Sequence, residues 1–221
     1  LDALTHFFVA RDSMYRQVYQ HRVLQAVDAM TVNIIRRLRD LIAEHPERSP
    51  QATCQAYSIF CDESMAIALA SANYVAESLD VIFQMTESWW RYHLNRWASC
   101  EDPVLSDLAA RLRDRRLLKT IRVEEGQERN REAQLATLLE RATAAAEEFG
   151  FDPRYYVVVI EEKDKHRGKH EDAPMALLDD GTVLPVTAVE PMIDQIMKRS
   201  PLSRTWLAVP KRVKEKLGRL R

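Results

Sequence analysis

Apolar side chains recur at three- or four-residue steps along the first 44 residues, and neither glycine nor proline interrupts them. This is the period of an amphipathic α-helix, so we expect one long central helix, or two in line, over residues 1–44. The apolar pattern is already present at Leu1, and no capping residue precedes it. We therefore expect the chain to be the C-terminal part of a longer protein.

Signals for further helices continue to about residue 114. The two prolines of residues 45–50 end the first helix and predict a loop. Side chains of the N-capping type then precede further apolar runs. The predicted caps and helices are Asp62 for residues 63–72, Ser78 for a helix towards Trp97, and Asp102 with Pro103 for residues 104–114.

After residue 114, β-compatible runs alternate with helical patterns in the order β-α-β-β-β-α. The Asp180-Gly181 pair predicts a hairpin turn between two of the strands. This order of elements predicts a small α+β subdomain beside a helical one. The predicted strands are residues 117–123, 154–162, 175–178 and 182–186, and the predicted helices are residues 127–149 and 191–198.

We therefore expect a mostly α protein with a small α+β C-terminal subdomain. Residues 1–114 form the helical part, residues 115–200 the α+β subdomain, and residues 201–221 a basic C-terminal tail. From residue 204 onward this tail has seven basic residues and one acidic residue, Glu215. Such a tail either contacts phosphates, for example those of single-stranded nucleic acid, or is an exposed end.

The amino-acid composition excludes several classes of protein function. The 221 residues include 32 Lys+Arg and 33 Asp+Glu, so the chain lacks the basic excess of a protein that coats nucleic acid. No apolar run reaches the ~20 residues that cross a bilayer, and no signal peptide is present. The three cysteines form no C-x-x-C pair, so we expect buried thiols without disulfides or zinc. These features predict a cytoplasmic protein without a membrane partner.

Arginine and tyrosine side chains lie along the middle of the first predicted helix. At about 100° per residue, Arg11, Tyr15, Val18 and Arg22 fall on one stripe, with Tyr19 beside it. Guanidinium groups match phosphate oxygens, and tyrosine packs on a sugar or base, so this stripe suits a nucleotide. The alternative is that the arginines pair with neighbouring carboxylates while the tyrosines fill the core, and the residues alone favour it.

The same segment carries a resemblance to a known family. The string Ala-Arg-x-x-Met-Tyr-x-x-Val-Tyr-x-His-Arg at residues 10–22 resembles the helix that follows the catalytic centre in HD-domain phosphohydrolases of the dNTP triphosphohydrolase (dGTPase-like) type. Residues 102–108 and 115–119, the tyrosines at 155–156 and the hairpin at 180–181 are similar to later parts of that family. The resemblance implies that residues 1–114 belong to an HD-type domain. It also implies an intact enzyme that converts a dNTP, usually dGTP, into a deoxynucleoside and triphosphate.

The resemblance implies roles for eight residues. Arg11 would hold the triphosphate, Tyr15 and Tyr19 would line the deoxyribose side, and Gln20 would lie near the sugar. The proposed contacts to an effector nucleotide, between subunits of a homo-oligomer, are His21, Arg22, Arg115 and Lys119. Strand alternation predicts that Arg115 and Lys119 share one face.

The metal ligands of the family are missing from these residues. In the family, a His, a His-Asp pair and a later Asp bind a divalent metal that activates water. No His-Asp dipeptide occurs among the 221 residues, so we expect the ligands upstream of Leu1 and no hydrolysis by this chain alone. His166 and His170 lie in a charged stretch that we expect to be a solvated connector. The alternative function is a noncatalytic helical module that binds nucleotides or regulates a partner.

Overall fold

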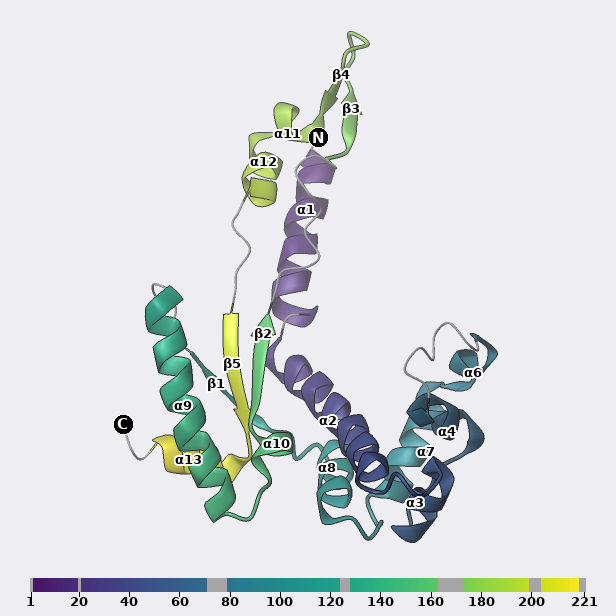
Figure 1. The fold of residues 1–221 in the computed structure, drawn as a ribbon. Helices are drawn as coiled ribbons and strands as arrows, with labels where there is room; N and C mark the ends of the chain where they lie inside the picture. Colours follow the sequence, from purple (N-terminus) through teal and green to yellow (C-terminus); the bar gives the residue numbers. More distant parts are fainter. Residues whose placement is uncertain are drawn as a thin grey trace.

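A computed structural model describes residues 2–19, 21–70, 79–123, 128–162, 173–198 and 204–218 (Figure 1). It confirms the predicted class, a mostly helical protein with a small C-terminal sheet. None of the helices within the described ranges combines the length and the hydropathy needed to cross a bilayer.

The N-terminal segment is not one continuous helix. Helix α1 (Asp2–Met14) passes into a π-helix, η1 (Tyr15–Tyr19), and α2 (Arg22–Glu44) starts afresh with His21 as its N-cap. The backbone of His21 is extended, at φ −71° and ψ 129°, and its Nδ1 accepts a hydrogen bond from the Val23 N–H at 3.3 Å. Because the two helices point in different directions (Figure 1), the single stripe predicted from Arg11 to Arg22 is wrong.

Helix α2 is the central element of the larger core. Its buried residues recur every three or four positions, as the apolar pattern predicts, whereas α1 has no buried residue. Trp97 and Leu105, both fully buried, belong to the same apolar cluster. The buried apolar residues of α2 are Ala26, Met30, Ile34, Leu38 and Leu41.

Side-chain caps begin most of the helices between α2 and the sheet. Asp62 caps α4 through the Met65 N–H at 2.8 Å, and Asp102 caps α8 through the Leu105 N–H at 2.7 Å, both as predicted. Ser78, the third predicted cap, lies outside the described residues; the helix that reaches Trp97 begins after Thr86 instead. The helices are α3 (Pro50–Ala56), α4 (Glu63–Ala70), α6 (Leu79–Gln84), α7 (Glu87–Trp97) and α8 (Pro103–Arg113).

The main sheet has three antiparallel strands in the order β1-β5-β2. These are β1 (Lys119–Arg122), β5 (Arg204–Val209) and β2 (Val158–Glu162). Alternate residues of β5 enter two cores: Trp206 and Ala208 join the α2 cluster, whereas Leu207 and Val209 face α9 (Glu128–Glu148) and α13 (Lys211–Gly218).

The sheet corrects two expectations from the sequence. Residues 201–221 are predicted to be a basic tail, but residues 204–218 form the central strand and a helix, because Leu207, Val209, Val213 and Leu217 are buried. The strand predicted over 154–162 begins only at Val158, because Asp152 and Pro153 start a short helix, α10 (Pro153–Tyr156).

The predicted hairpin forms a separate unit. Strands β3 (Met175–Leu177) and β4 (Val183–Pro185) pair across a turn in which Gly181 adopts φ +85°, a left-handed conformation that favours glycine. Helices α11 (Val186–Val189) and α12 (Pro191–Lys198) follow, and α12 packs against α1. The hairpin therefore lies at the N-terminal end of α1, away from the three-stranded sheet (Figure 1).

Candidate functional site

Arg11, Tyr15 and Tyr19 form a continuous stack at the junction of α1 and η1. The Arg11 guanidinium carbon lies 5.0 Å from the centroid of the Tyr15 ring, and the rings of Tyr15 and Tyr19 are 5.2 Å apart at an angle of 48°. Tyr19 is 52% exposed, so the outer end of the stack is open to a ligand. The three residues thus come together as the sequence motif predicts. Gln20, the fourth residue predicted for this site, lies outside the described residues.

The π-helix is what separates this stack from Arg22. A π-helix contains an extra residue relative to an α-helix and is frequent at functional sites. Met14 and Val18 are also about half exposed here, so apolar packing does not explain the local geometry. A cation held over an aromatic ring, with a second phenol beside it, is suited to bind a phosphorylated sugar.

The four residues predicted to contact an effector are distributed over three elements. His21 caps α2 through its ring, and Arg22 is the first residue of that helix. Arg115 is exposed in the turn after α8, at φ +55°, and Lys119 is exposed at the start of β1. The alternation argument for Arg115 and Lys119 is wrong, because Arg115 precedes the strand and does not follow its pleat.

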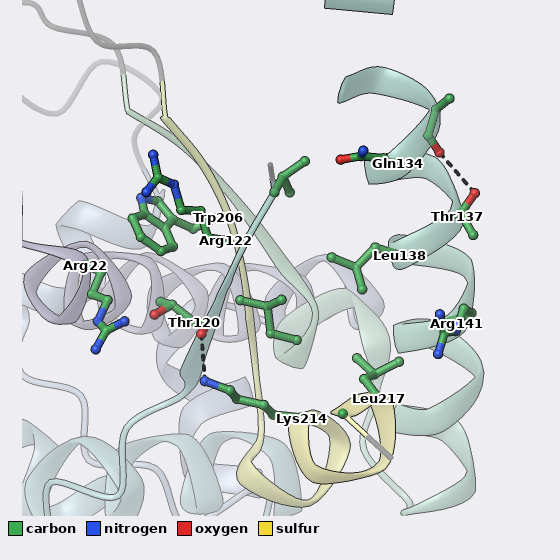
Figure 2. Close-up of a pocket in the computed structure, with 14 residues that line it drawn as sticks. Arg22, Thr120, Arg122, Gln134, Thr137, Leu138, Arg141, Trp206, Lys214 and Leu217 are labelled. Carbon is green, nitrogen blue, oxygen red and sulfur yellow. Dashed lines mark hydrogen bonds between the residues drawn. The ribbon is translucent and has the colours of Figure 1, made fainter. Parts of the chain in front are cut away.

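Arg22 lines a cavity of about 1140 Å³ along the edge strand β1 (Figure 2). Helices α9 and α13 supply the opposite wall, with Arg141 and Lys214. The remaining cation is Arg122 on β1, whose guanidinium carbon lies 5.9 Å from the Trp206 ring centroid. Four cationic residues line this cavity, and no carboxylate is among the described residues that line it.

Sequence reasoning missed three of these cations. Lys214 lies among other basic residues, and such a segment predicts an exposed tail. The sequence alone therefore does not indicate that Lys214 lines a cavity. Arg122 and Arg141 carry no motif, and only the pairing of β1 with β5 and the packing of α9 on α13 bring them near Arg22. The one available signal is local: Arg141 has no acidic residue three or four positions away on its helix.

Asp62 has a structural role. Besides capping α4, its Oδ2 accepts a hydrogen bond from the Trp89 Nε1 at 2.6 Å. The buried His93 lies beside it, with Nε2 3.5 Å from Asp62 Oδ1. Within the described parts of the chain, no three His, Cys, Asp or Glu side chains converge as a metal site would require. His166 and His170 lie outside those parts.

The cysteines are free thiols. Cys54 and Cys100 are buried, as expected, and Cys61 is half-buried. Burial raises the pKa of the Cys100 thiol to about 11, so this thiol stays protonated at neutral pH. The geometry at Cys100 therefore indicates packing, not nucleophilic chemistry.

Comparisons with known proteins identify a shared fold. No protein-family model matches the chain. The chain is 28% identical over 166 residues to the uncharacterized protein YwfO of Bacillus subtilis. The aligned region covers 74% of this chain and 33% of that protein. A solved structure of a phosphohydrolase from Bacteroides thetaiotaomicron is similar with a TM-score of 0.70 and 18% identity, over 92% of this chain and 48% of that one. The chain thus spans about a third of the first protein and about half of the second, and it shares the fold of the second.

Proposed function

We propose that this chain is the C-terminal part of a metal-dependent HD-domain phosphohydrolase that converts a dNTP into a deoxynucleoside and triphosphate. The observation that carries the proposal is the stack of Arg11, Tyr15 and the exposed Tyr19 at the π-helix. The fold shared with a phosphohydrolase and the motif at residues 10–22 support the same reading.

Each residue of the stack has a distinct part in the proposal. Arg11 binds triphosphate oxygens through a bidentate contact. Tyr15 holds the guanidinium from one side, and the half-exposed Tyr19 packs on the deoxyribose. Gln20 is proposed to lie near the sugar. These residues bind and orient the substrate, and none of them is asked to activate water.

The divalent metal of the proposal belongs to another part of the whole protein. The described carboxylates and histidines do not fit a metal site, since no three of them converge. Asp62, for example, already accepts hydrogen bonds from the Trp89 indole N–H and from a backbone N–H. We therefore assign no hydrolytic step to this chain.

The proposal also includes an effector nucleotide and self-association. His21, Arg22, Arg115 and Lys119 are the proposed effector contacts, and the position of Arg22 in a basic cavity supports this assignment. Apolar side chains of α1 that point to solvent, such as Phe7 at 59% exposure, support contact with another subunit or with the rest of the protein.

The direct test is a product analysis with the full-length protein. Each dNTP is incubated with Mg²⁺ or Mn²⁺, and the products are separated by anion-exchange chromatography. The proposal predicts deoxynucleoside and tripolyphosphate in equal amounts. Release of orthophosphate or pyrophosphate would contradict the reaction class. Tight dNTP binding without turnover would instead support the noncatalytic nucleotide-binding module.

A further inference from the structure

Cys54 and Cys61 bring two free thiols together where α3 is followed by α4. Cys54, near the end of α3, is only 2% exposed, and Cys61, just before α4, is half-buried. Both side chains pack in the apolar cluster around α2. Their thiol groups share a hydrogen bond, so the two sulfur atoms are already in contact in the folded chain.

The end of α3 folds the chain back towards Cys54. Ser58 adopts the left-handed φ of +52°, and the Ile59 N–H donates to the Cys54 carbonyl at 2.8 Å. This is the hydrogen bond of a Schellman turn, which reverses the chain directly after a helix. The Trp97 indole N–H then donates to the Phe60 carbonyl at 2.7 Å and anchors the returning segment. The contact between the two thiols therefore follows from the backbone geometry.

The shared hydrogen bond sets this pair apart from the third cysteine. The hydrogen bond with Cys61 lowers the pKa of the Cys54 thiol, because it stabilises the Cys54 thiolate. Burial instead raises the pKa of Cys100 to about 11. The proton that remains in the pair can move from Cys61 to Cys54, which leaves the thiolate on the less buried sulfur. The pair thus combines a nucleophile nearer the surface with a second sulfur in contact with it.

We propose that Cys54 and Cys61 form a reversible disulfide, with a low-molecular-weight disulfide such as oxidised glutathione as the oxidant. The Cys61 thiolate attacks one glutathione sulfur, the glutathione disulfide breaks, and one glutathione thiolate leaves. Cys54 then loses its proton and attacks the Cys61 sulfur, and the second glutathione thiolate leaves. The two protein thiols give up two electrons and two protons, and one glutathione disulfide becomes two glutathione molecules.

The disulfide connects α3 to the first turn of α4. Asp62 follows Cys61 directly, caps α4 through the Met65 N–H at 2.8 Å and accepts a hydrogen bond from the Trp89 Nε1 at 2.6 Å. A covalent bond at Cys61 therefore holds this cap next to α3 and restricts local opening. Helices α3 and α4 lie at the end of α2 that is far from α1 (Figure 1), so the disulfide does not depend on the proposed hydrolysis.

The test is a titration of the full 221-residue chain with oxidised glutathione, followed by mass spectrometry. The chain should lose two hydrogens, about 2 Da, and dithiothreitol should restore the original mass. Chymotrypsin cleaves after Tyr57 and Phe60, between the two cysteines, so their peptides should stay joined until the disulfide is reduced. Oxidation should also raise the thermal midpoint by about 3–8 °C, because the bond closes a short loop in the unfolded chain.

Three serine variants assign the role of each sulfur. Cys54→Ser should keep one glutathione on Cys61, since no second sulfur displaces it. Cys61→Ser should gain neither glutathione nor a disulfide, because Cys54 is buried. Cys100→Ser is the matched control, since Cys100 is a buried cysteine of the same cluster, and it should form the disulfide like the parent. The thermal midpoint under reducing conditions verifies that each variant is folded.

Four results would overturn the proposed disulfide. These are an unchanged mass, a stable glutathione adduct on the parent chain, a disulfide that includes Cys100, or equal thermal midpoints for the oxidised and reduced chains. If Cys54→Ser does not fold, the chymotryptic peptides of the parent still identify the bond directly. None of these readouts involves dNTP turnover, so failure of the disulfide and failure of the proposed hydrolysis are distinguishable.

Discussion

The guanidinium of Arg11 lies over the ring of Tyr15, with its carbon 5.0 Å from the ring centroid. The ring of Tyr19 lies next to that of Tyr15, at a centroid distance of 5.2 Å. Both tyrosines belong to η1, so the π-helix places the ring that Arg11 contacts and the ring beside it. We therefore expect the position of the Arg11 guanidinium to depend on the Tyr15 ring.

Replacement of Tyr15 tests this dependence. In the full-length protein, Tyr15→Leu should raise KM for the dNTP roughly two- to fivefold, since an exposed cation–π contact contributes about 0.5–1 kcal/mol. Tyr15→Phe keeps the ring and should stay within twofold of the parent KM. Equal KM values for the leucine and phenylalanine variants would show that the ring does not position Arg11.

Asp102 joins α2 to α8 and should be important for stability. It accepts hydrogen bonds from Arg37 Nη2 at 2.7 Å and from the Leu105 N–H at 2.7 Å, and it is only 2% exposed. Asp102→Ala leaves a half-buried guanidinium without this partner, so we expect a loss of about 3–5 kcal/mol in the free energy of unfolding. Urea denaturation of the parent and of Asp102→Ala measures this difference in the free energy of unfolding.

The exposed Asp114 at the end of α8 provides the control for that experiment. It pairs with Arg113 on the surface, where ion pairs contribute little. Asp114→Ala should leave the urea midpoint unchanged. Similar losses in both variants would mean that the Arg37–Asp102 connection has no special role.

The central position of β5 predicts that its apolar residues are essential for folding. Leu207 is fully buried between the sheet and the α9–α13 layer. Leu207→Ala should therefore cost about 2–5 kcal/mol in the free energy of unfolding. Met175→Ala, at a 60% exposed position of the separate hairpin, should have a small effect. A stable Leu207→Ala variant would contradict the assignment of residues 204–209 to the core.

The loss of folding stability at alkaline pH should depend on Tyr156. Burial and a hydrogen bond to Asp107 at 2.7 Å raise the pKa of Tyr156 well above its ordinary value of 10.0. The folded state thus keeps this proton while the unfolded state loses it, so stability is retained below pH 10.0 and falls above it. Each pH unit above that value should cost about 1.4 kcal/mol for this one group.

Tyr156→Phe removes the titrating hydroxyl and isolates its contribution. Tyr155, whose pKa burial also raises, remains and should keep part of the alkaline decline. Urea titrations at several pH values should therefore give a shallower decline for the variant than for the parent. Identical slopes would exclude Tyr156 as the source.

Local signals predicted most of the fold. The period of apolar residues in α2, the capping aspartates at 62 and 102, and the turn at Gly181 each act over a few residues, and the structure has them all. The break at His21 escaped prediction because no glycine or proline marks it. A π-helix depends on tertiary context that the apolar period does not encode.

Non-local pairing explains what the sequence could not predict. Strand β5 pairs with both β1 and β2, which lie far before it in the chain, and its basic flanks suggested a tail. The same pairing brings Arg122 to Trp206 and encloses the basic cavity. By contrast, Arg11, Tyr15 and Tyr19 lie within nine consecutive residues, so their stack was predictable from spacing alone.

The measurement that tests the central claim most directly is dNTP hydrolysis by the full-length protein with Arg11→Ala. A charge-assisted contact to phosphate contributes about 1.5–3 kcal/mol, so kcat/KM should fall roughly ten- to a hundredfold. Arg91→Ala is the control, since Arg91 is an exposed arginine of α7 that pairs with Glu87. A loss confined to Arg11→Ala is the predicted result, and unchanged turnover in a folded Arg11→Ala protein would contradict the account.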